Sequence, residues 1–161
     1  MGSNRIVVGI DGSESSKDAL RWAKAQAEAT GAELVAVTAW SPPYASFPML
    51  VDRLPVEGES DLEAASRSAL ERVVKETIGD GPVVLDVVEG HPVTALLDAA
   101  RDASLVVVGG RGHGGFVGGL LGSVGHHLVA HALCPVVVVR HPKEPSADGR
   151  LRAALRMSPV P

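Results

Sequence analysis

Five short apolar segments alternate along the chain with longer stretches of helical periodicity. Each segment is too brief for a buried helix and is rich in β-branched residues, which is typical of strands covered on both faces. The segments are Arg5–Ile10, Glu33–Trp40, Val83–Val88, Leu105–Val108 and Pro135–Val139. Their alternation with helices predicts an α/β fold, a five-stranded doubly wound parallel sheet with helices on both faces. A ligand site is then expected beyond the carboxyl ends of the strands, where the strand order reverses.

Residues that begin and end helices support this order. The predicted helices are Glu14–Thr30, Asp61–Ile78, a third that opens at His91-Pro92, and Ser123–Leu133. Ser13 is the expected N-cap of the first helix, and Gly31 and Gly79 end the first and second. The chain has 161 residues, 45% of them hydrophobic, which suits one domain. We expect this domain to span residues 5–140, followed by a flexible C-terminal tail, 141–161.

The charge and the cysteine count exclude several classes of protein. A net charge of −4 and a pI near 5.8 argue against binding to nucleic acid or to an anionic membrane surface. The apolar run Ile6–Ile10 is too short for an export signal, and no stretch approaches the length of a membrane span. Cys134 is the only cysteine, which excludes an intramolecular disulfide and favours a buried thiol. We therefore expect a soluble, cytoplasmic protein whose partner is a small ligand or another protein of unknown identity.

Glycine is concentrated between the fourth predicted strand and the fourth predicted helix. Residues 109–125 hold nine of the 18 glycines in the chain. Such crowding suits a backbone that approaches a ligand closely and points its N–H groups inward. The segment leads into a helix at Gly122-Ser123, where free N–H groups favour an anion, and no Asp or Glu occurs between Ala103 and Lys143. A phosphate site is the favoured interpretation, and a flexible, solvated surface loop is the alternative.

Two common phosphate-binding motifs do not account for this segment. A P-loop requires a Gly-Lys dipeptide, which occurs nowhere in the chain. Gly110, Gly112 and Gly115 match the spacing of a dinucleotide fingerprint, but the acidic residue that would hold the ribose is missing.

The spacing Gly109-x2-Gly112-x9-Gly122-Ser123 resembles the ATP-binding signature of the universal stress protein family. The resemblance extends to Val7 to Ser13, to Trp40-Ser41-Pro42, to Gly90-His91-Pro92 and to Cys134 to Val139, and so covers residues 5 to 140. It implies a cytoplasmic, commonly dimeric protein of the adenine-nucleotide-binding fold, with ATP across the switch point. Some members of the family bind AMP, cyclic AMP or no nucleotide.

The resemblance also implies which residues contact the nucleotide. They are Gly9 and Asp11 at the nucleoside, Ala39 at the adenine, Gly109, Arg111 and Gly112 at the ribose and inner phosphates, and Gly122, Ser123 and Val124 at the outer phosphates. A divalent cation, Mg²⁺, is expected to be carried on the phosphates, since it retains water and needs few protein ligands.

The last predicted strand gives a separate reason to expect a homodimer. Val136 to Val139 is expected at an edge of the sheet, where it would expose an apolar template if unpaired. Pairing of Pro135 to Val139 with its copy in a second chain would cover this edge. The alternative cover is residues 141–161 folding back, which their polarity and prolines disfavour.

The leading functional hypothesis is a nucleotide-responsive stress regulator, and a slow ATPase is the alternative. Hydrolysis needs a positioned base, for which only Asp11, His113 and His126 are candidates, and no catalytic residue is assigned. The segment Ser41 to Ser60 is either a lid over the site or a disordered excursion.

One further motif is weighed as a metal site. His127 and His131 have the i, i+4 spacing of two helical metal ligands. No Asp or Glu lies nearby in the sequence to complete or orient such a site. We therefore expect the spacing to be coincidental and assign no metal ligand.

Overall fold

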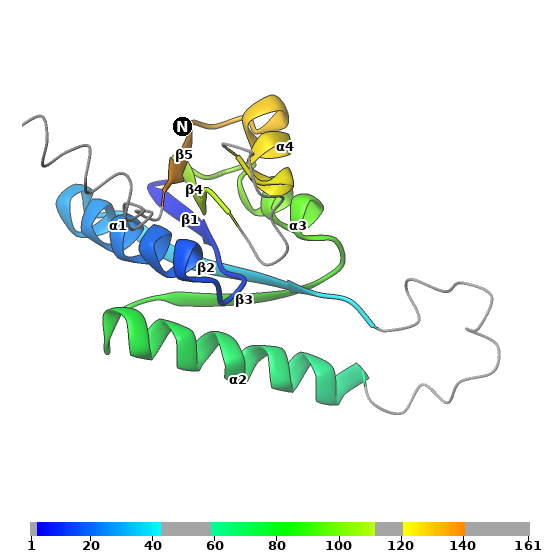
Figure 1. Ribbon diagram of the computed structural model, residues 1–161. Coiled ribbons are helices and arrows are strands. Elements are labelled where there is room, and N and C mark those ends of the chain that lie inside the picture. Colours follow the sequence, from blue (N-terminus) through cyan, green and yellow to red (C-terminus); the bar gives the residue numbers. More distant parts are fainter. Residues whose placement is uncertain (1–2, 43–58, 112–120, 141–161) are drawn as a thin grey trace, which may run out of the picture.

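The structure is a computed structural model that describes residues 3–42, 59–111 and 121–140. Its strands form one parallel sheet in the order β3-β2-β1-β4-β5 (Figure 1). The strands are β1 (Arg5–Gly9), β2 (Glu33–Trp40), β3 (Val84–Glu89), β4 (Leu105–Gly109) and β5 (Val136–Val139). The predicted doubly wound five-stranded α/β fold is therefore confirmed. Gly112, His113, most of the segment 41–60 and the whole of 141–161 lie outside the described residues.

Helices cover both faces of this sheet (Figure 1). They are α1 (Glu14–Thr30), α2 (Glu59–Ile78), α3 (Pro92–Ala99) and α4 (Ser123–His131). Alternate residues of β1 point to opposite faces, so that Val8 lies in the same buried cluster as Leu20 of α1, and Val7 lies in the cluster that contains Leu128 of α4. All four of these side chains are fully buried. No helix among the described residues is both long and apolar enough to cross a membrane.

The order of the strands fixes where the chain reverses direction across the sheet. β1 lies at the centre and pairs on one side with β2, Ile6 opposite Leu34, and on the other with β4, Ile6 opposite Leu105. The connections after β1 and β4 therefore leave the sheet toward opposite faces. The switch point is at the carboxyl ends of these two strands. β5 lies at one edge, as expected, and its pairing with a second chain stays a prediction.

The ends of α1 confirm the capping residues that the sequence indicates. The Ser13 hydroxyl accepts a hydrogen bond from the Ser16 N–H, and Gly31 ends the helix in the left-handed conformation at φ 66°. The end of α4 differs from the prediction, because the helix stops at His131 rather than Leu133. Ala132 is already extended, with φ −67° and ψ 143°, and Pro135 disfavours helical backbone at the residue before it.

Replacing Gly31 with alanine is expected to destabilise the protein modestly. A Cβ at this position would meet no heavy atom within 4 Å, so only the left-handed backbone opposes the substitution. That conformation costs a residue with a Cβ about 1–2 kcal/mol. Thermal unfolding should show a melting temperature lower by roughly 2–8 °C. Gly81→Ala, at a site with equal space and no positive φ, is the control, and equal melting temperatures for the two variants would contradict the explanation.

Candidate functional site: a pocket at the switch point

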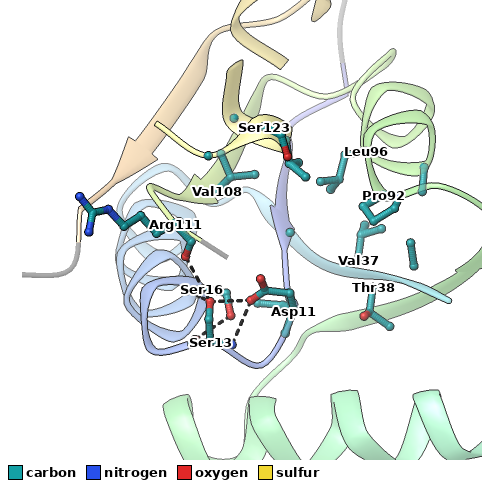
Figure 2. Close-up of a pocket in the computed structure, with 18 of the residues that line it drawn as sticks. Asp11, Ser13, Ser16, Val37, Thr38, Pro92, Leu96, Val108, Arg111 and Ser123 are labelled. Carbon is teal, nitrogen blue, oxygen red and sulfur yellow. Dashed lines mark hydrogen bonds between the residues drawn. The ribbon is translucent and has the colours of Figure 1, made fainter. Parts of the chain in front are cut away.

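A pocket of about 550 Å³ lies at the carboxyl ends of β1, β2 and β4 (Figure 2). Eight of the nine residues that the sequence indicates for nucleotide contact line it, and the ninth, Gly112, lies outside the described residues. The eight are Gly9, Asp11, Ala39, Gly109, Arg111, Gly122, Ser123 and Val124. Residues separated by more than one hundred positions in the chain therefore surround a single space.

One wall of the pocket is apolar. Its side chains come from the end of β2, from α3 and from β4: Val37, Ala39, Pro92, Leu96 and Val108. Ala39 is the only one of these that the sequence indicated as a site residue. The other four have no polar group that would indicate a ligand site in the sequence. Only Val37 and Val108 could have been expected there, because they belong to strands whose carboxyl ends form the site.

Gly9 shows why the end of β1 must lack a side chain. A Cβ at Gly9 would lie 2.9 Å from Leu96 Cδ1 and 3.3 Å from Val108 Cγ1. Both of these neighbours belong to the apolar wall. Glycine at this position therefore lets Leu96 pack against the strand and shape the pocket.

A polar corner lies opposite the apolar wall, at the start of α1 (Figure 2). Asp11 Oδ1 accepts hydrogen bonds from the Ser13 N–H at 2.9 Å and from the Ser13 hydroxyl at 2.6 Å. Ser13 in turn caps α1, and Ser16 also lines the pocket. Asp11 thus holds the turn that directs the N-terminus of α1 toward the pocket. The sequence identified Ser13 as a cap but neither serine as a site residue.

Arg111 lines this corner with its backbone. Its N–H donates to the Ser15 hydroxyl at 3.3 Å, and its carbonyl oxygen lies 3.4 Å from the Ser13 hydroxyl, whose single hydrogen has its shorter contact with Asp11. The guanidinium extends away from Asp11 and Ser123 in Figure 2. In the described structure, therefore, the main chain of Arg111 lies at this corner of the pocket, and its charged guanidinium does not.

The N-terminus of α4 completes the pocket. Gly122 is the N-cap, with φ −70° and ψ 163°, and it has no side chain to cap the free N–H groups of the first turn. The Gly122 N–H donates to the Gly110 carbonyl at 2.9 Å, which joins the two ends of the glycine-rich segment. Uncapped N–H groups and the positive end of the helix dipole make this the part of the pocket best suited to an anion.

Few candidate catalytic or metal-binding groups meet in the pocket. Of Asp11 and His126, only Asp11 lines it, and His126 is exposed on α4. No group of three or more His, Cys, Asp or Glu suited to a metal occurs among the described residues.

Cys134, expected to be buried, is only half-buried, because it follows the early end of α4. Its partial burial raises the pKa of the thiol, which lowers the fraction of reactive thiolate at neutral pH.

The sheet order and the glycine-lined pocket define the class of protein. The described residues form a doubly wound parallel α/β fold with a pocket at the switch point, where proteins of this class bind their ligands. It matches the model of the universal stress protein family over residues 2–140 and belongs to that family.

Known relatives agree with this assignment. Universal stress protein Rv1996 of Mycobacterium tuberculosis (strain ATCC 25618 / H37Rv) is 40% identical over 146 residues, which cover 88% of this chain and 45% of that protein. The chain thus spans about half the length of the curated relatives it matches.

Solved structures share the fold. A universal stress protein solved in complex with cAMP is 29% identical, with a TM-score of 0.59 over 86% of this chain and 98% of that one. Hypothetical protein MJ0577 is 22% identical, with a TM-score of 0.70 over 89% of this chain and 100% of that one.

Proposed function

We propose that this chain binds ATP in the switch-point pocket and acts as a nucleotide-responsive stress regulator. One observation carries the proposal: a single pocket joins an apolar wall at β2 and α3 to the uncapped N-terminus of α4. An adenine ring needs the first surface and a phosphate chain needs the second. The volume of about 550 Å³ lies within the range of small-molecule sites.

The lining residues suggest how the nucleotide lies. The adenine packs near Ala39 and Leu96, and the sugar near Gly9 and Asp11, where β1 ends. The phosphates point toward the N-terminus of α4, where the backbone N–H groups of Ser123 and Val124 donate to them. Gly109, at the end of β4, lets the chain pass close to the inner phosphates.

A divalent cation fits this arrangement as a companion of the phosphates. The described residues offer no cluster of metal ligands, so a protein cage for Mg²⁺ is not available among them. Mg²⁺ retains most of its water and is held chiefly by phosphate oxygens in many nucleotide sites. Asp11 is the one carboxylate among the described lining residues, and it would reach such an ion through water.

A cyclic nucleotide or AMP is the second candidate ligand. It is favoured by the family member that was solved in complex with cAMP, which is 29% identical to this chain. The same apolar wall would take the adenine of either ligand. Only ATP would extend three phosphates along the N-terminus of α4, so the two candidates predict different affinities.

We also propose that the protein is a cytoplasmic homodimer paired through Pro135 to Val139. β5 is an edge strand whose valines are all partly exposed in the single chain. Unpaired apolar edges promote association, and a two-fold pairing of equal strands would satisfy both copies.

The binding proposal is tested on freshly purified protein. Mass spectrometry of the released small molecules should identify an adenine nucleotide, and calorimetric titration should rank ATP above AMP and cyclic AMP. A higher affinity for cyclic AMP than for ATP would support the second candidate. Absence of binding to all three nucleotides would sink the proposal and leave the pocket with another ligand.

A further inference from the structure

A pair of histidines lies on α4 away from the lining of the pocket. His127 and His131 are one helical turn apart, and both side chains are exposed. Their ring centroids are 6.4 Å apart, with the ring planes tilted by 35°. The two rings therefore stand next to each other and face solvent.

A backbone carbonyl orients the first of these rings. His127 Nδ1 lies 2.8 Å from the carbonyl oxygen of Ser123. A carbonyl oxygen only accepts hydrogen bonds, so Nδ1 must carry the hydrogen and donate it. The neutral ring then presents the lone pair of Nε2 to solvent. Histidines that bind metals nearly always donate their other ring nitrogen in this way, to a carboxylate or a main-chain carbonyl.

We propose that His127 and His131 together bind a transition-metal ion of the Zn²⁺ or Ni²⁺ type, with water in the remaining positions. Imidazole nitrogen suits these ions, whereas Mg²⁺ and Ca²⁺ prefer oxygen. Two metal–nitrogen bonds of about 2.1 Å would bring the ring centres to roughly 5 Å. Since both side chains are exposed, rotation of His131 closes the gap of about 1 Å without opposition from packed neighbours.

The neighbouring groups define what kind of site this is. Among the described residues, no third His, Cys, Asp or Glu completes a cluster, so the site is an open, exchangeable one rather than a structural zinc site. His126 is next in sequence but its ring stands edge-on to that of His127, at 89°. Cys134 follows the helix, but its partly buried thiol is less readily ionised than a free one, and thiolate is the form that binds metals.

Metal binding would link the two ends of α4. The ion would join His131, in the last turn, to His127, whose ring is hydrogen-bonded to Ser123 in the first turn. Ser123 also lines the switch-point pocket. The site consists of the two histidines alone and does not depend on nucleotide binding.

The test uses the full chain purified without a histidine tag. Calorimetric titration with Zn²⁺ should give one ion per chain, and the untagged protein should be retained on immobilised Ni²⁺. His127→Gln and His131→Gln should each weaken Zn²⁺ binding about tenfold or more, since even the loss of an outer-shell partner costs about 10- to 100-fold. His126→Gln is the matched control, an exposed histidine on the same helix, and should bind as the unmodified protein does.

Thermal unfolding without metal establishes that the His126, His127 and His131 variants are folded. Saturating Zn²⁺ should then raise the melting temperature only of the proteins that retain both His127 and His131. Equal affinities for the unmodified protein and the His127 and His131 variants would overturn the proposal. An equal loss in His126→Gln, or one ion for every two chains, would also overturn it, because the site would then not be a pair on one helix.

Discussion

Replacing Gly122 with glutamate is expected to abolish nucleotide binding while leaving the fold intact. The substitution places a carboxylate at the N-cap of α4, where the proposed phosphates accept hydrogen bonds. Two like charges about 4 Å apart repel by about 4 kcal/mol at an effective dielectric constant of about 20. That energy corresponds to an affinity lower by roughly three orders of magnitude. Calorimetric titration of ATP into both proteins measures the difference.

The backbone at Gly122 makes this variant interpretable. Its φ of −70° and ψ of 163° are open to any residue, so glutamate introduces no backbone strain. Gly81→Glu is the matched control, because it adds the same charge at an exposed glycine where a Cβ meets nothing within 4 Å. We expect the control to bind ATP as the unmodified protein does. Unchanged binding in Gly122→Glu would show that the phosphates lie elsewhere.

Replacing Gly109 with alanine is expected to destabilise the whole domain. A Cβ at this position would lie 2.5 Å from Ser15 Oγ, 2.6 Å from its carbonyl carbon and 2.7 Å from its carbonyl oxygen. Two of these atoms belong to the backbone of α1, so rotation of a side chain cannot relieve the overlap. Overpacking typically costs about 1–3 kcal/mol, and this rigid contact places the loss at about 3 kcal/mol or more.

Thermal unfolding followed by circular dichroism measures this loss, with an expected decrease of roughly 10 °C in the melting temperature. The adjacent Gly110→Ala is the control, since its Cβ would approach the Val139 carbonyl oxygen no closer than 3.4 Å. Similar melting temperatures for the two variants would mean that α1 moves readily away from β4, contrary to the explanation.

The sequence predicted the elements of the fold well because each carries its own local signal. The bounds of α1 agree because Ser13 and Gly31 act within one helical turn of the residues they cap. β2 agrees with its predicted bounds because it is a short apolar run that includes the β-branched Val35, Val37 and Thr38 and that starts soon after the helix-ending Gly31. The end of α4 was predicted two residues too late, since nothing in His131 to Leu133 signals the extended backbone that begins at Ala132.

Within the candidate site, the glycines and Asp11 were predicted from the resemblance to the family signature, and the other lining residues required three-dimensional information. The apolar wall depends on Leu96, which is indistinguishable in sequence from a core residue. The contact of Gly109 with Ser15 joins residues 94 positions apart. The orientation of His127 depends on a main-chain carbonyl, which every residue possesses and which therefore leaves no mark in the sequence.

The central position of β1 has a consequence for the synthesis of the protein. Its first partner, β2, follows within one helix, but Ile6 meets Leu105 only after 99 further residues have been added. At about 5–20 residues per second, one edge of β1 therefore stays open for roughly 5–20 s on the ribosome. Exposed apolar edges of this kind promote aggregation, so the nascent chain is more prone to aggregate during this time than the folded protein, in which β4 covers that edge of β1. The pocket, which needs both β1 and β4, is among the last features to form.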